Sequence, residues 1–226
     1  MRLDLISLLA ALTLLAAGSA CDDDETTDGK TTGAGAGSGT GGGGGEAPAL
    51  PATSPKALVK LKTALRFRAD VSRSLQIPEL EVCRELGFLD CAGLHQVVMG
   101  EADPYLSALY EPVPATSATS PLAYERVAVS ACAQRVDADL SSAAPLLFKG
   151  LDVSGGAVAD PNGPAMAESI RELYRRTLSR EASDHEVATL TGAYASIAAA
   201  DPTTPARSWA LASCVAVTTS LENVFY

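Results

Sequence analysis

The chain has 226 residues and a formal net charge of -10, with 17 Lys and Arg against 27 Asp and Glu. This balance excludes a basic nucleic-acid-binding protein as a first expectation, because phosphate backbones are bound mainly by Lys and Arg. The length suits about one domain, and the low aromatic content of 5% leaves Ala and Leu to supply most of a core. The sequence carries no specific catalytic signature.

The N-terminal segment has the pattern of a secretory signal. Arg2 precedes an apolar run from Leu5 to Ala17, which is followed by small residues and Cys21. The run is shorter than the about 20 residues that a membrane-spanning helix needs. The sequence therefore predicts a signal peptide over residues 1–20 rather than a permanent membrane span.

The end of this segment, Ala17-Gly18-Ser19-Ala20-Cys21, resembles the lipobox of bacterial lipoproteins. The resemblance implies that Cys21 carries the lipid and becomes the first mature residue, which makes a bacterial membrane the first expected partner. Gly18 stands where the family usually has an aliphatic residue. The alternative is an ordinary signal peptide cleaved near Ala20, and the choice between inner and outer membrane stays open.

A low-complexity segment follows the signal. Residues 22–54 contain six acids, one Lys and ten of the 19 Gly residues of the chain. Such a composition cannot bury enough apolar surface to offset the entropy of ordering. We expect residues 21–54 to be the lipidated Cys with a disordered acidic and Gly-rich linker, followed by a helical domain over residues 55–226.

Start signals and apolar spacing predict five longer helices in this domain. Their expected starts are Ser54-Pro55, Ser120-Pro121, Asn162-Gly163-Pro164, the Ser183 capping box and Thr204-Pro205. The apolar stripes include Leu65 and Val71, Leu122 and Val136, Ile170, Tyr194, and Trp209 with Leu221. A short segment runs from Pro78 to Leu86, and residues 88–119 are expected to be irregular or β. The fold class is therefore mainly α, with about five to six helices in a single domain.

Four cysteines lie in the predicted domain: Cys83, Cys91, Cys132 and Cys214. An exported chain with an even cysteine number favours two disulfides. Cys83 and Cys91 would close a nine-residue loop, leaving Cys132 for Cys214. Free buried thiols are one alternative, and a metal site with His95 is another, although the spacing matches no compact zinc motif.

Candidate catalytic groups are few. His185 is expected to be a solvated residue, and His95 a structural imidazole, with a general base or a metal ligand beside Glu101 and Asp103 as its alternative. Asp137 and Asp139 should point to different sides of a helix. Four arginines of one predicted helix form a basic stripe: Arg171, Arg175, Arg176 and Arg180. We expect them to pair with Glu168, Glu172 and Glu181; the alternative is a site for an anion or a partner.

The C-terminal third resembles secreted families of unknown function from planctomycetes and myxobacteria. The resemblance rests on ELYRRTLSREASDHEVATL from Glu172 to Leu190 and WALASCVAVTTSLENVFY from Trp209 to Tyr226. It implies terminal helices but no activity. It transfers no functional residue.

The sequence therefore predicts a lipid-anchored protein of the bacterial cell envelope with a non-catalytic binding or assembly module, for which enzymatic activity is not expected. An envelope protein is a possible partner, nucleic acid is not expected, and no cofactor or metal is assigned. The alternative function is an envelope enzyme or metal-binding protein that uses His95 with nearby Cys or acidic residues.

Overall fold

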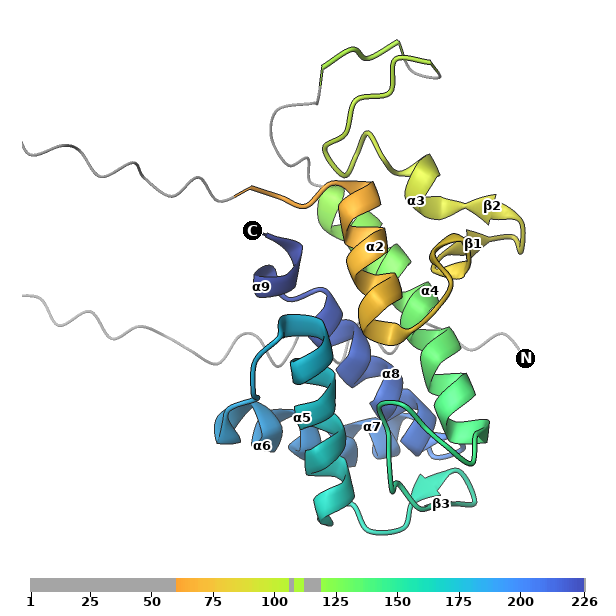
Figure 1. Ribbon diagram of the computed structural model, residues 1–226. Coiled ribbons are helices and arrows are strands. Elements are labelled where there is room, and N and C mark those ends of the chain that lie inside the picture. The colour runs from red at the N-terminus through yellow and green to blue at the C-terminus, as the bar shows by residue number, and fades with distance from the viewer. Residues whose placement is uncertain (1–59, 106–107, 112–118, 226) are drawn as a thin grey trace, which may run out of the picture. The chain divides into compact units, whose positions relative to one another are not determined.

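The computed structural model describes residues 60–105, 108–111 and 119–225, which belong to one compact unit, Val59–Tyr226. The described part is mainly helical, as predicted (Figure 1). Its longer helices are α2 (Ala64–Leu75), α4 (Ser120–Ser141), α5 (Pro164–Leu178), α6 (Asp184–Gly192), α7 (Tyr194–Ala200) and α8 (Pro205–Thr218). The expected signal peptide, Cys21 and the linker lie outside the described residues.

Helix α2 begins later than the sequence predicts. Thr63 is its N-cap, and the Thr63 side chain accepts a hydrogen bond from the backbone N–H of Arg66. Just before it, Leu61 forms an antiparallel bridge with Phe225, and the N–H of Lys62 donates to the carbonyl of Val224 at 2.8 Å. This pairing holds residues 61 and 62 in extended backbone. The expected helix over residues 55–75 is therefore wrong for its described first residues.

Helices α4 and α8 pack against each other in the centre of the described unit (Figure 1). Trp209 of α8 is fully buried, and its ring makes edge contacts with Phe148 and Tyr194. Its indole N–H donates to the carbonyl of Leu190 at 2.8 Å, which satisfies the one polar atom of the ring. Burial on this scale makes Trp209 a main anchor between α8 and the α6–α7 region.

The capping box at the start of α6 is confirmed. The Ser183 hydroxyl accepts from the backbone N–H of Glu186, and the Glu186 carboxylate accepts from the backbone N–H of Ser183 at 2.7 Å. The helix that follows is divided, however, because α6 ends at Gly192 and α7 begins at Tyr194. The sequence therefore identifies the start of this segment but not its interruption.

The last predicted helix is also divided. Helix α8 ends at Thr218, and a short helix α9 (Leu221–Val224) follows Ser220, whose backbone is extended. Leu221 is consequently 77% exposed rather than inward as expected. Leu65 and Leu122 are also more than half exposed, so three expected core positions are wrong.

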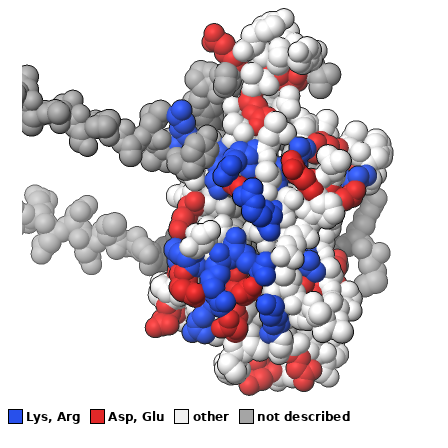
Figure 2. Space-filling model, viewed as in Figure 1, with Lys and Arg blue, Asp and Glu red and all other residues white. Residues whose placement is uncertain are grey.

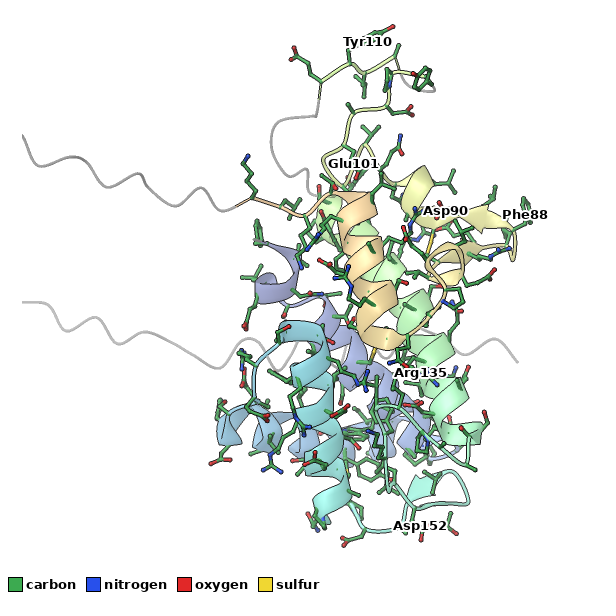
Figure 3. All side chains as sticks on the ribbon, viewed as in Figure 1. Phe88, Asp90, Glu101, Tyr110, Arg135 and Asp152 are labelled. Carbon is green, nitrogen blue, oxygen red and sulfur yellow. A yellow bond between two sulfur atoms is a disulfide. The ribbon has the colours of Figure 1, made fainter. Side chains whose placement is uncertain are left out.

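Residues 78–119 contain short elements. A 3₁₀ turn, η2 (Glu79–Glu81), precedes the antiparallel pair β1 (Arg84–Glu85) and β2 (Leu89–Asp90), and α3 (Cys91–Leu94) follows. Leu86 and Gly87 have positive φ at the hairpin turn, and Phe88 projects from this tip (Figure 3). Residues 95–99 form turns rather than a strand, while Asp103 and Leu109 form a single bridge. The irregular or β expectation for residues 88–119 is thus confirmed in their described part, except for the one-turn helix α3, which the sequence analysis did not predict.

A second hairpin was not predicted. Strands β3 (Val153–Ser154) and β4 (Ala157–Val158) pair antiparallel around Gly155 and Gly156. Both glycines have positive φ, as a two-residue hairpin turn requires. The strands are too short to show an alternating apolar pattern, which is why the periodicity gave no signal for them.

Two buried carboxylates fix connecting segments. Asp139 of α4 accepts hydrogen bonds from three successive backbone N–H groups, those of residues 146–148, at 2.7 to 3.2 Å, and it pairs with Arg135 (Figure 3). Asp201 accepts from Ser208, Thr203 and Thr204 at the start of α8. The hydrogen bonds from Ser208 and Thr203 hold the pKa of Asp201 well below its usual range.

Candidate anion-binding pocket

The structure brings the four domain cysteines together in pairs. Cys83 and Cys91 flank the β1–β2 hairpin with Cα atoms 5.5 Å apart, and Cys132 of α4 meets Cys214 of α8 with Cα atoms 5.8 Å apart. Both distances lie in the usual disulfide range. This is the pairing that the loop lengths favour, and two disulfides suit an oxidising compartment outside the cytoplasm.

His95 is not part of a metal-ligand cluster. Its Nε2 lies 3.3 Å from the carboxylate of Glu85 in β1. Glu101, the neighbour considered with it, accepts a hydrogen bond from the backbone N–H of Leu65 at the start of α2 (Figure 3). Within residues 60–105, 108–111 and 119–225, no group of three or more His, Cys, Asp and Glu side chains is placed to hold a metal ion. The Glu101 carboxylate thus acts as an N-terminal cap of α2. His185, the other histidine, is exposed, as expected for a solvated residue.

The two acids near the end of α4 separate as predicted. Asp137 lies at the surface and binds the guanidinium of Arg207 through two contacts of 2.7 and 3.0 Å. Asp139, two residues further along α4, is buried and accepts hydrogen bonds from the backbone of residues 146–148. They do not form a pair that could exchange a proton.

The arginines of the basic stripe on α5 are paired with acids, as expected from the sequence. Arg175 binds Glu168, Glu172 and Glu181, and Arg176 binds Glu172 at 2.6 Å. Although partial burial opposes it, the hydrogen bond and charge of Arg176 lower the pKa of Glu172. This side of α5 is a neutralised ion-pair network rather than an open cationic surface.

A pocket of about 400 Å³ lies beside this network, between the α2 region, the end of α5 and α9. The α2 region lines the pocket with Lys62, Arg66, Asp70, Arg73 and Ser74. The end of α5 and the residue that follows it contribute Arg176, Thr177, Leu178 and Ser179, and α9 contributes Glu222 and Asn223. Lys and Arg side chains gather over α2 and the neighbouring part of α5 on the face shown in Figure 2. The pocket therefore combines four cations with two carboxylates on a chain that is acidic overall.

Three of these cations share one acid. The largely buried carboxylate of Asp70 contacts Lys62 at 3.0 Å, Arg66 at 3.1 Å and Arg73 at 3.4 Å. We call these four residues the Asp70 cluster. One carboxylate balances only one of the three positive charges, so the cluster keeps a surplus of two. Arg66 and Arg73 are 60% and 74% exposed, which leaves their remaining N–H donors open to a ligand.

The opposite wall supplies fixed polar groups. Glu222 is held by Arg180, which also binds Glu186. The hydrogen bond from Arg180 lowers the pKa of both carboxyl groups, that of Glu186 to about 2. The buried hydroxyl of Thr177 has no hydrogen-bond partner among the described residues, and it lines the pocket.

The amino-acid sequence contains a signal for this pocket that the apolar spacing of single helices does not reveal. Residues 56–73 hold six Lys or Arg and a single acid, Asp70. The acidic composition of the whole chain conceals this basic block. Its charge density, rather than the Arg stripe of α5, marks the unbalanced cationic site.

Comparison of this chain with protein-family models, curated proteins and solved structures gives no match. Among the described helices, none has both the length and the apolar composition that crossing a membrane requires.

Proposed function

We propose that this protein is a lipid-anchored component of the bacterial cell envelope, and that its folded unit is a non-catalytic binding module which holds an anionic group in the pocket beside α2. The anchor rests on the lipobox-like residues ending at Cys21. The binding role rests on one observation: the Asp70 cluster places three cations around a single carboxylate at the wall of a pocket.

The surplus charge supports an anionic ligand. A unit charge about 4 Å from another contributes about 1 kcal/mol in water, which corresponds to about a fivefold change in affinity. Arginine also presents several donors in a planar fork, which suits carboxylate and phosphate oxygens. Because the surplus cations are exposed, the attraction should weaken as salt is added.

Calorimetric titration of the full chain in neutral detergent, with inorganic pyrophosphate as the probe, tests this binding role. We expect Arg73→Gln to weaken binding about fivefold, because it removes one exposed cation of the pocket. Asp70→Asn should strengthen binding by a similar factor, because it removes the internal carboxylate that competes for the three cations.

Arg171→Gln is the matched control. Arg171 is a surface arginine of α5 that pairs with Glu168 and does not line the pocket; its side chain is 39% exposed, against 74% for Arg73. Absence of binding, or an equal loss in the Arg73 and Arg171 variants, would contradict the proposed function.

A further inference from the structure

Two arginines of the Asp70 cluster are held together on one face of α2. Arg66, Asp70 and Arg73 follow one another at steps of four and three residues, which places them on the same side of the helix. The Nε atom of Arg66 lies 3.1 Å from one oxygen of the Asp70 carboxylate, and the Nη1 atom of Arg73 lies 3.4 Å from the other. One largely buried carboxylate therefore brings two exposed guanidinium groups within reach of the same small ligand.

Both guanidinium groups keep donors for such a ligand. In their described contacts, Arg66 uses Nε and Arg73 uses Nη1, so the two Nη groups of Arg66 and the Nε and Nη2 groups of Arg73 remain available. Lys62 differs, because its side chain is only 12% exposed and its amine contacts both Asp70 and the side-chain oxygen of Asn223. It adds positive charge to the site, while the two arginines offer the contacts.

The positive surplus around the pocket amounts to two charges. Three cations surround Asp70, which leaves two of them unbalanced. Arg180 is shared by two acids, Glu186 and Glu222, which leaves one negative charge in excess. The neighbouring network of α5 has four cations for three acids: Arg171, Arg175, Arg176 and Lys149 with Glu168, Glu172 and Glu181. The last two groups cancel, so the surplus of the Asp70 cluster remains.

A surplus of two charges favours a dianion over a monoanion. A phosphate monoester carries nearly two negative charges at about pH 8, because its second pKa is about 6. A phosphate diester, a sulfate ester or a carboxylate carries only one. All of these groups have oxygens that a guanidinium can bind, so shape alone does not choose between them. Since the second ligand charge would interact with two arginines, it should strengthen binding about fivefold or more.

We propose that the pocket binds a phosphate monoester as its dianion, with the terminal oxygens of the phosphate bridging Arg66 and Arg73 beside Asp70. This inference rests on the proposed function, because it names the class of anion that the same pocket takes. The same phosphate group occurs in soluble phosphate esters and in lipid headgroups that end in a phosphate, and both sources present the same oxygens to the two arginines.

Calorimetric titration of the full chain in neutral detergent at about pH 8, with methyl phosphate and methyl sulfate as probes, tests the charge preference. The two probes have the same shape and the same number of terminal oxygens but differ by one charge. We expect methyl phosphate to bind about fivefold more tightly or better. Arg73→Gln leaves a surplus of one and should reduce this ratio, whereas Arg171→Gln, which changes no residue of the pocket wall, should preserve it.

The outcomes separate this inference from the proposed function. If pyrophosphate binds and Arg73→Gln weakens it, but methyl phosphate binds no more tightly than methyl sulfate, the inference is overturned and the proposed function stands. If none of the three probes binds, the proposed function itself is overturned.

A lipid probe distinguishes the two sources of the phosphate. Dihexanoyl phosphatidic acid carries the same phosphate monoester on a lipid. If it binds more tightly than methyl phosphate and Arg73→Gln weakens it, the ligand is a lipid headgroup. Binding equal to or weaker than that of methyl phosphate identifies a soluble ester.

Discussion

Removal of the two disulfides one at a time gives a quantitative test of the fold. The Cys132–Cys214 bond spans 82 positions of sequence and joins α4 to α8, whereas Cys83–Cys91 spans only 8 and closes a hairpin. In the chain-entropy model, a disulfide stabilises a protein by restricting its unfolded state, and the effect grows with loop length. The longer loop should contribute about 4.5 kcal/mol and the shorter about 2.6 kcal/mol to the free energy of unfolding.

We therefore expect the double replacement of Cys132 and Cys214 by Ala to lower the free energy of unfolding by about 2 kcal/mol more than the same replacement of Cys83 and Cys91. The four residues are buried, so the loss of sulfur packing is similar in both variants. The comparison thus isolates the loop length.

Guanidinium unfolding monitored by fluorescence is the assay. Trp209 is the sole tryptophan, is fully buried and lies on α8, the helix that also carries Cys214. The reasoning is refuted if the two double variants lose equal stability, or if the Cys83–Cys91 variant loses more.

Three further predictions concern polar groups that hold the fold. Asp139→Ala should cost about 3 to 5 kcal/mol in denaturant unfolding, because it leaves three backbone N–H groups and a largely buried arginine without their acceptor; a loss below about 1 kcal/mol would contradict this role. Ser183→Ala should cost about 1 kcal/mol by removing the capping box of α6, measured in the same way, and an unchanged unfolding midpoint would count against it. Because the folded-state pKa values of Asp201 and Glu186 lie below those of the unfolded chain, their stabilising contribution should be complete above about pH 5 and lost as the pH falls toward 2. Stability that rises on acidification over that range would contradict the assignment.

Local signals predicted much of the helical structure. The starts of α4, α5, α6 and α8 follow from Ser, Thr, Gly and Pro at positions where these residues favour helix initiation. The paired arginines of α5 also follow from sequence spacing, since their acids lie three or four positions away. Residues that interact within one helical turn are close together in the sequence, so their spacing alone predicts the contact.

Contacts between distant residues explain the errors. The late start of α2 depends on the pairing of Leu61 with Phe225, at the other end of the unit. The pocket has the same origin, because Lys62 and Asn223, whose side chains are 3.4 Å apart, are separated by 161 positions of sequence. The basic composition of residues 56–73 could have indicated a cationic site, but not which residues of α5 and α9 would close it.

The intact mass of the protein extracted from membranes, before and after reduction with alkylation, tests the anchored envelope domain most directly. We expect a chain that begins at Cys21 and carries lipid, with four cysteines that are alkylated only after reduction. A mass without lipid, together with thiols that react before reduction, would contradict both the membrane anchor and the two disulfides.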